Sequence, residues 1–242
     1  MRYDIFKNKN VLVTGATGGL GQEIVSILAD NGCNLFLTSL NEHKLKILKN
    51  KLSNNINCGS VFTHAGDLKK VDDIIDICFK AKTMLSDRID ILINCAGIFP
   101  LKKLSETTLA DYDECMAINV KAPFLFVREF VSGMRENKWG RIVNIGSSSA
   151  YSGSPDAGLY CISKHALLGL SRSLFQELKE DNIRVYSYSP GSIRTEMGRT
   201  DKRQDFSTFL DPKEVAEYVL FIMSYDAELV SEEIRVNRIQ VR

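Results

Sequence analysis

Two side chains, Tyr160 and Lys164, have the types and spacing that suit proton transfer. They are four positions apart, so in a helix the phenol and the ammonium share one face and can approach each other. A free tyrosine has a pKa near ~10, and lowering it by about 3 units requires roughly 4 kcal/mol. One cation at ~4 Å supplies about that much at an effective dielectric of ~20. The pair therefore predicts that Lys164 lowers the pKa of Tyr160 and makes it a general acid–base group.

The surrounding sequence separates this pair from a second one with the same spacing. Tyr3 and Lys7 precede the first strand-like segment with no pocket element beside them, so we interpret them as a solvated stretch. Tyr160 instead follows Ser147 by thirteen residues, and Ser147 ends the apolar run 141–146. Ser147 also suits a turn at a strand end, and the two serines after it have the same hydroxyl. Only Ser147 keeps the thirteen-residue step.

Composition limits the class of protein. The 242 residues include 31 basic and 30 acidic side chains, a net charge of +1, which gives no support for a nucleic-acid or anionic-membrane partner. No segment is long and apolar enough for a signal peptide or a bilayer span of ~20 residues. The cysteines form no C-x-x-C pair, which favours free thiols in a reducing cytosol over disulfides or a metal site. We expect a soluble, cytoplasmic protein without metal. The cysteines are Cys33, Cys58, Cys78, Cys95, Cys115 and Cys161.

Short apolar runs alternate with longer helical patterns along the whole chain. The runs are continuous rather than alternating, which is typical of parallel strands covered on both faces. We predict one α/β domain, residues 1–242: a Rossmann-type, doubly wound parallel sheet of about seven strands with helices on both faces. The predicted strands are Asn10–Thr14, Asn34–Thr38, Val61–His64, Ile89–Asn94, Arg141–Ile145, Ile183–Ser189 and Ile234–Ile239. Predicted helices include Gly21–Asn31, Leu68–Leu85 and Leu159–Lys179.

The least regular segment is Ser192–Leu210, in which four basic residues interrupt any apolar period. A lid over a site fits this composition, and so does a plain solvated loop.

A glycine-rich stretch, Thr14–Gly21, joins the first strand to the first helix. Glycines there let the backbone approach a pyrophosphate, whose charge the exposed helix amides and the helix dipole favour. A tight strand–helix turn without a ligand is the alternative. The spacing fits two patterns, because either Gly18 or Gly19 can be the middle glycine between Gly15 and Gly21.

Together these motifs resemble the short-chain dehydrogenase/reductase family over residues 8 to about 225. Only 78 residues follow Lys164, and the fourth strand ends in Asn-Cys-Ala-Gly; both features resemble the compact oxidoreductase branch of the family. The tail 230–237 lacks the Thr-Gly-Gln and Asp-Gly-Gly elements of many acyl-carrier reductases in the family. The matching motifs are Thr14–Gly21, Asn94–Gly97, Asn119, Ser147, Tyr160, Lys164 and Pro190-Gly191.

The resemblance implies a catalytic set. Tyr160 would be the general acid in reduction, Ser147 would orient the substrate carbonyl, and Lys164 would lower the tyrosine pKa and hold the nicotinamide ribose. Asn119 would bind a water that relays protons to Lys164, although a buried asparagine bonded to backbone is the alternative.

The resemblance also implies positions that contact the dinucleotide. Asp67 would lie at the adenine, but it equally suits the N-cap of the following helix. The positions implied are Gly15, Thr17, Gly18, Gly19, Leu20, Gly21, Ser39, Leu40, Asp67, Leu68, Asn94, Ala96, Gly97, Tyr160, Lys164, Pro190, Gly191, Ile193 and Thr195.

The end of the second strand bears on which nicotinamide binds. An acidic residue at the end of this strand selects NAD, and residues 37–41 include none. A basic residue at position 40 or 18 selects NADP, but these positions are Leu40 and Gly18. The hydroxyls of Thr17, Thr38 and Ser39 can still surround a phosphate, so we favour NADP over NAD.

The sequence thus predicts an NAD(P)-dependent oxidoreductase acting on a carbonyl or secondary alcohol. A 3-oxoacyl-thioester reductase, with an acyl carrier protein as partner, and a general ketone or sugar-alcohol dehydrogenase both remain open. Lys138 and Arg172 suit an acidic carrier or plain solubility, and a non-catalytic dinucleotide-binding subunit is a third reading. Segments 117–134 and 159–178 carry apolar residues on more than one face, more than a single sheet contact requires. The family resemblance implies that these helices pair between chains, so we expect a homo-tetramer or homo-dimer. Ser149, Tyr151 and Ser154 are candidate substrate-pocket residues.

Overall fold

The computed structural model describes residues 3–239 and contains one seven-stranded sheet in which every neighbouring pair of strands is parallel. The strand order is β3-β2-β1-β4-β5-β6-β7. The strands are β1 Asn10–Thr14, β2 Asn34–Ser39, β3 Val61–Ala65, β4 Ile91–Asn94, β5 Gly140–Ile145, β6 Ile183–Pro190 and β7 Glu233–Val236. The predicted fold class is confirmed.

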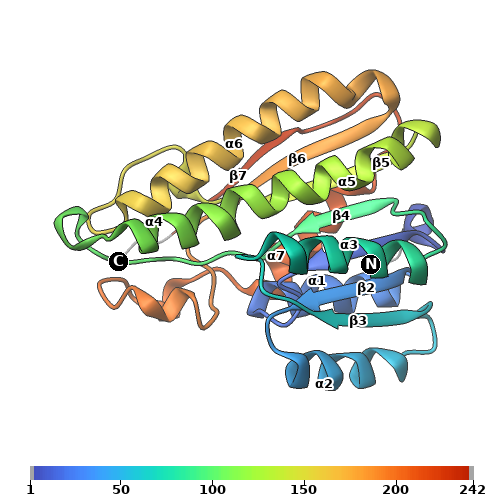
Figure 1. The fold of residues 1–242 in the computed structure, drawn as a ribbon, viewed down its shortest axis with the longest axis horizontal. Coiled ribbons are helices and arrows are strands. Elements are labelled where there is room, and N and C mark those ends of the chain that lie inside the picture. Colours follow the sequence, from blue (N-terminus) through green and yellow to red (C-terminus); the bar gives the residue numbers. More distant parts are fainter. Residues whose placement is uncertain (1–2, 240–242) are drawn as a thin grey trace.

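Helices cover both faces of this sheet (Figure 1). The helices are α1 Gly19–Asp30, α2 Glu42–Ser53, α3 Val71–Met84, α4 Leu109–Met116, α5 Ala122–Glu136, α6 Gly158–Leu178 and α7 Pro212–Met223. A π-helical turn, Ala117–Lys121, joins α4 to α5. None of the helices found within residues 3–239 is long and apolar enough to cross a bilayer.

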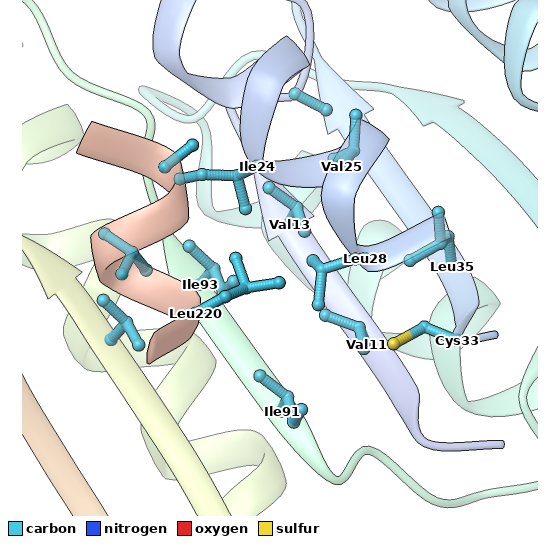
Figure 2. Close-up of a cluster of buried hydrophobic side chains, with 14 of the residues drawn as sticks. Val11, Val13, Ile24, Val25, Leu28, Cys33, Leu35, Ile91, Ile93 and Leu220 are labelled. Atoms are coloured by element: carbon cyan, nitrogen blue, oxygen red, sulfur yellow. The ribbon is translucent and has the colours of Figure 1, made fainter. Parts of the chain in front are cut away.

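The core has two parts, one on each face of the sheet. On one face, apolar residues of α1, α2 and α7 pack on the sheet, with Ile24, Leu28 and Leu220 against strands β1 and β4 (Figure 2). On the other face, α3 and α5 pack on the sheet through residues such as Ile77 and Phe126. Because both faces are covered, the strands need apolar residues at successive positions, which explains their unbroken apolar runs.

The predicted ends of the strands and helices agree with the structure at some positions and differ at others. β1 has the predicted bounds, whereas β7 ends at Val236, three residues before the predicted end. Helix α3 begins at Val71 with Lys70 as its N-cap, so the proposed capping role of Asp67 is wrong. Asp67 instead accepts a hydrogen bond from the Lys69 amide at 3.1 Å.

The strand order reverses direction between β1 and β4, and this reversal prepares a binding site. Chains leave the carboxyl ends of these two strands toward opposite faces of the sheet, so a crevice opens between the loops that follow them. The glycine loop follows β1, and Asn94–Gly97 follows β4. The fold therefore brings both motifs to one edge of the sheet.

Candidate active site

A cavity of about 650 Å³ lies at the carboxyl ends of the central strands. Its walls come from the segments after β1, β4, β5 and β6, together with the start of α6 and the tail after β7. Most of the positions predicted from the sequence line it. They are Gly15, Gly18, Gly19, Leu20, Gly21, Ala96, Gly97, Ser147, Tyr160, Lys164, Pro190, Gly191, Ile193 and Thr195.

The glycine loop packs so tightly that side chains are excluded at three of its positions. Gly15 has φ +64°, and a Cβ there would lie 2.7 Å from the Ala96 backbone. A Cβ on Gly19 would lie 2.5 Å from the Thr195 methyl, and one on Gly21 would overlap the Gly15 carbonyl oxygen. At Gly18 the nearest atom would be 3.3 Å away. Of the two spacings, the structure therefore makes Gly15, Gly19 and Gly21 the sterically required set.

This loop fits a dinucleotide phosphate. Helix α1 begins at Gly19. Its N-cap residue is Gly18, which makes no side-chain capping hydrogen bond to the first amides of the helix. Its first amides therefore face the cavity with the positive end of the helix dipole behind them. The residues present fit the pyrophosphate of a nicotinamide dinucleotide.

Ser147, Tyr160 and Lys164 lie on the walls of the same cavity. Ser147 lies two residues after β5 and accepts a hydrogen bond from the Ser149 amide at 3.1 Å, so its hydroxyl proton can still be donated to another group. Lys164 is buried on α6, and its Nζ donates to the Ile145 carbonyl at 2.8 Å. That Nζ lies 5.6 Å from the centre of the Tyr160 ring, so the two side chains share one helix face as predicted. By contrast, Tyr3 and Lys7 are remote from the cavity lining.

The predicted lowering of the Tyr160 pKa is wrong. Burial raises the pKa of Tyr160 to about 12, and a hydrogen bond with Ser147 offsets only part of this. Burial also lowers the pKa of Lys164 to about 8, with Cys95 and Cys115 acting in the opposite direction. The sequence argument counted the attraction between the two groups, but the loss of water around both has the larger effect. Tyr160 is consequently a protonated phenol at neutral pH.

Asn119 lies in the π-helical turn rather than in a regular α-helix. Its Oδ1 accepts from the Ile98 amide at 2.9 Å, and its Nδ2 donates to the Ile98 carbonyl and to Ser163 Oγ, both at 3.0 Å. The side chain is thus occupied by backbone and a serine, as in the alternative considered from the sequence. A Cβ on Gly97 would lie 3.3 Å from Asn119 Oδ1 and 3.7 Å from Lys164 Nζ, so Asn119 borders the space in front of Lys164. Its role in proton relay stays a prediction.

Several predicted cofactor positions lie beyond the cavity walls. Thr17 Oγ1 donates to Ser39 Oγ at 2.9 Å, and the Leu40 side chain is 73% exposed next to them. Asn94 is buried and donates to Asn144 Oδ1 at 2.8 Å, while its own Oδ1 lacks a hydrogen-bond partner in the described structure. Leu68 is buried in the core beneath Asp67. Their contacts with a cofactor stay predictions.

Comparison with known proteins identifies the family. The family model described as short chain dehydrogenase matches residues 9–205. The chain belongs to the short-chain dehydrogenase family. It is 32% identical over 241 residues to the 3-oxoacyl-acyl-carrier-protein reductase of Rickettsia felis, covering 95% of each chain. It is 27% identical over 248 residues to the D-beta-hydroxybutyrate dehydrogenase of Rhizobium meliloti, covering 92% of this chain and 94% of the relative.

Solved structures agree with this assignment. A metagenomic short-chain oxidoreductase in complex with NADP is 28% identical and superposes with a TM-score of 0.84 over 96% of this chain and 98% of the other. Levodione reductase is 25% identical, with a TM-score of 0.87 over 96% of each chain. As a short-chain dehydrogenase, this protein is an NAD(P)-dependent oxidoreductase.

The structure adds cavity residues that the sequence motifs of the short-chain dehydrogenases did not single out. Phe99 packs edge-on against Tyr160, with ring centres 4.7 Å apart. Met197, Gln204 and Arg238 also line the cavity. Phe99 could have been found from its place two residues after Gly97, but nothing in the local sequence marks the other three.

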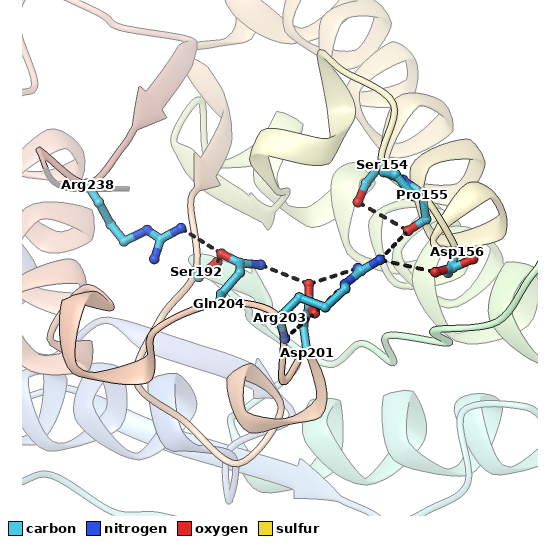
Figure 3. Close-up of polar contacts among 8 residues, drawn as sticks. All are labelled: Ser154, Pro155, Asp156, Ser192, Asp201, Arg203, Gln204 and Arg238. Atoms are coloured by element: carbon cyan, nitrogen blue, oxygen red, sulfur yellow. Dashed lines mark hydrogen bonds and ion pairs between the residues drawn. The ribbon is translucent and has the colours of Figure 1, made fainter. Parts of the chain in front are cut away.

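The irregular segment 192–210 contributes one wall of this cavity and is tied to two other parts of the chain (Figure 3). Arg203 pairs with Asp201 at 2.7 Å and with Asp156 at 3.1 Å, which joins the segment to the loop after Ser147. Gln204 and Arg238 join it to the tail after β7. Hydrogen bonds from Arg203 and Gln204 hold the pKa of Asp201 well below its usual range, so this network is charged at neutral pH.

Two of the candidate substrate residues line the cavity and one does not. Ser149 and Ser154 are on its wall. The Tyr151 ring lies beneath the Arg235 guanidinium instead, 4.2 Å away, and is not part of the lining.

Proposed function

We propose that this protein is an NADP(H)-dependent reductase that interconverts a ketone and a secondary alcohol, with Tyr160 as the proton donor. The observation that carries the proposal is the position of Ser147, Tyr160 and Lys164 on the walls of one cavity, which the glycine loop also lines. When bound there, the nicotinamide supplies or accepts the hydride.

Tyr160 and Ser147 act on the substrate oxygen. As hydride reaches the carbonyl carbon, negative charge develops on that oxygen, and donors already in place stabilise it. Ser147 Oγ accepts from the Ser149 amide, and its hydroxyl proton remains able to donate to the substrate oxygen. Tyr160 is protonated at neutral pH, because its pKa is raised to about 12, so it has a proton to give. In reduction Tyr160 therefore transfers its proton to the alkoxide oxygen.

Lys164 supports this proton transfer through its position and its charge. Its Nζ is fixed by the Ile145 carbonyl and lies 5.6 Å from the centre of the Tyr160 ring. A positive charge there stabilises the phenolate that proton transfer leaves behind. The buried ammonium also suits a hydrogen bond to the ribose hydroxyls of the nicotinamide, and Asn119 borders the path by which a water could return the proton.

The end of β2 supports NADP rather than NAD. There is no acid to accept the ribose hydroxyls or repel a phosphate. The Ser39 hydroxyl, which accepts from Thr17, keeps its own proton to donate to a phosphate. Exposed His43 and Lys44 follow in the first turn of α2. We expect kcat/KM to be higher with NADPH than with NADH when initial rates are followed at 340 nm, and a ratio below one would overturn this preference.

Two substrate classes remain candidates. A 3-oxoacyl thioester is supported by the similarity to the reductase of Rickettsia felis over nearly the whole chain. A small ketone or sugar alcohol is supported by Arg172, whose guanidinium is engaged by both carboxylate oxygens of Glu233, at 2.8 and 2.9 Å, and is thus less available to an acidic carrier protein. A panel of 3-oxoacyl thioesters, ketones and polyols assayed at 340 nm separates the two.

The decisive test of the chemistry is Tyr160→Phe. The substitution removes only the hydroxyl, so the edge-on contact with Phe99 and the cavity shape are kept. We expect turnover to fall by roughly 10²–10⁴-fold, the usual contribution of a positioned general acid. NADPH binding, followed by its fluorescence, should change by less than about threefold.

The control is Tyr151→Phe, which removes the hydroxyl of a tyrosine outside the cavity lining and should leave turnover nearly unchanged. Full activity in Tyr160→Phe would refute the assigned role. Dinucleotide binding without turnover of any carbonyl in the panel, in the natural protein, would instead favour a regulatory subunit.

A further inference from the structure

Arg238 is a cation in the cavity that the proposed chemistry does not use. It follows β7 and lines the same cavity as Tyr160. Its Nη2 donates to Gln204 Oε1 at 2.6 Å (Figure 3), and its Nη1 donates to Thr208 Oγ1 at 2.9 Å. These contacts fix the guanidinium in place, but neither acceptor carries a negative charge.

The arginines of the neighbouring segment 192–210 are held differently. Arg194 pairs with Asp211, Arg199 with Glu196, and Arg203 with Asp201 and Asp156. Among residues 3–239, no carboxylate oxygen lies within 4.0 Å of the Arg238 guanidinium. Because a guanidinium has five N–H donors and the two bonds above use two, Arg238 has donors and charge left for another group.

The other charges on the cavity wall do not compensate it. The charged residues that line the cavity are Lys164, Glu196, Asp201 and Arg238. Asp201 is saturated by Arg203 and Gln204, and the side chain of Glu196 is 95% exposed and pairs with Arg199. Arg238 lies over the Phe209 ring at 4.9 Å, a favourable contact for a cation, but that contact leaves its outer N–H donors free for an anionic ligand.

We propose that Arg238 is a specificity-determining residue that binds an oxyanion carried by the substrate itself, a carboxylate or a phosphate away from the reacting carbonyl. The planar fork of a guanidinium matches both anions. Ser192 and Asn237 also line the cavity, and Ser192 Oγ donates to Gln204 Oε1 at 3.0 Å. This inference rests on the proposed reductase function and names the kind of substrate it accepts.

The test uses substrates in matched pairs that share a carbonyl and differ in the anion. One arm compares 3-oxobutanoate, 4-oxopentanoate and 5-oxohexanoate with their methyl esters, which measures how far a carboxylate must lie from the carbonyl. The other arm compares acetoacetyl-phosphopantetheine, which carries a phosphate, with acetoacetyl-pantetheine, which differs only in lacking it. The arm that responds identifies the source of the anion.

Arg238→Gln removes the charge and keeps a side chain that can donate to Gln204 and Thr208. We expect kcat/KM for the preferred anionic substrate to fall roughly 10- to 100-fold, mainly through KM, as for a lost charge-assisted hydrogen bond. The neutral partner should change less than about threefold, and Arg238→Lys should keep much of the preference for the anion.

The matched control is Arg235→Gln, because Arg235 lies over the Tyr151 ring outside the cavity and should not affect either substrate. Three results in Arg238→Gln would each overturn the inference. The first is an equal loss of kcat/KM on charged and neutral substrates, and the second is no loss of kcat/KM on any anionic substrate. The third is weaker NADPH binding with an unchanged substrate preference.

Failure of the proposed reductase function gives a different result. In that case the natural protein reduces neither member of any pair. Thermal unfolding in the presence of NADPH then tests whether Arg238 binds the anion. The inference is supported if oxo acids or phosphopantetheine raise the Tm of the natural protein but not that of Arg238→Gln. Equal shifts of Tm in both proteins overturn it.

Discussion

At the scale of single residues, burial affects the two groups proposed for proton transfer in opposite directions of pKa. Burial raises the pKa of the Tyr160 phenol and lowers that of the Lys164 ammonium, so both resist carrying charge. For Tyr160 this means a proton available for donation at neutral pH. For Lys164 it means that a charge needed for function is kept where water is excluded, at the expense of stability.

Replacing Lys164 should therefore stabilise the fold. Its pKa is about 8 in the folded protein and 10.5 ordinarily, so below pH 8 the folded state carries the full penalty of a buried ammonium. That penalty is about 3 kcal/mol, and losing the bond to the Ile145 carbonyl returns about 1 kcal/mol. We expect Lys164→Met to be more stable by about 1–2 kcal/mol at pH 7 in urea unfolding without cofactor.

The pH dependence has a definite sign. Between pH 8 and 10.5 the unfolded chain holds the Lys164 proton and the folded chain does not, so the stability of the natural protein rises with pH in this window. The advantage of Lys164→Met should therefore shrink toward pH 10. The exposed Lys179, at the end of the same helix, provides the control, since Lys179→Met should change stability by less than about 0.5 kcal/mol. A Lys164→Met protein less stable than the natural one at pH 7 would contradict the argument.

The catalytic set could be predicted from sequence because it is defined by residue types at fixed separations. Ser147, Tyr160 and Lys164 are within eighteen positions, and one strand end and one helix position all three. The direction of the Tyr160 pKa shift was predicted wrongly, because a sequence lists charges but not the water removed from them. Arg238 was missed for another reason. Its partners Gln204 and Thr208 are 34 and 30 residues away in the sequence, and no local sequence pattern predicts contacts between such distant positions.

At the scale of elements, the junction of β1 and α1 depends on one contact between distant segments. The backbone of Gly19 is packed against the methyl group of Thr195, so the loop that follows β6 lies directly on the glycine loop. A change at either position is transmitted to the other because neither backbone has space to move.

Gly19→Ala should accordingly destabilise the protein by about 1–3 kcal/mol, as overpacking usually does. The added Cβ would lie 2.5 Å from Thr195 Cγ2 and 2.9 Å from Thr195 Cβ. Thr195→Ser removes only the Cγ2 contact, so the double variant should recover part of the loss in thermal unfolding without cofactor. Gly18→Ala is the control, since its Cβ meets nothing closer than 3.3 Å. Equal effects at positions 18 and 19 would show that the contact with Thr195 is not the cause.

The helices and strands themselves were predicted well in their middles and less well at their ends. Continuous apolar runs identify strands covered on both faces, so all seven were found. Ends depend on caps and on what the next segment contacts. α3 begins at Val71 and not at Leu68, because Leu68 enters the core before the helix starts. β7 stops at Val236 because the residues after it turn to the cavity.

At the scale of the whole molecule, exposed apolar side chains on α5 and α6 support the predicted assembly of identical chains. Phe124 on α5 is 46% exposed and Ile162 on α6 is 48% exposed. Large apolar groups that face solvent on neighbouring helices are typical of surfaces that pair.

Light scattering should therefore give a mass that is a multiple of 27.2 kDa. Phe124→Asp places a charge in the expected interface and should shift the mass toward the single chain. Phe79→Asp makes the same kind of change at a 66% exposed position on α3 and should leave the mass unchanged. A mass of 27.2 kDa for the natural protein would refute the assembly.

The π-helical turn at 117–121 also determines which way the following helix points. Such a turn holds one residue more than an α-helical turn, and each residue advances a helix by about 100°. The side chains of Phe126, Phe130 and Met134 reach the core only with this offset. Deletion of one residue in the turn would restore ordinary winding and rotate that stripe off the sheet. The extra residue beside Asn119 thus sets the rotation of α5 about its axis, and the apolar positions of α5 match that rotation.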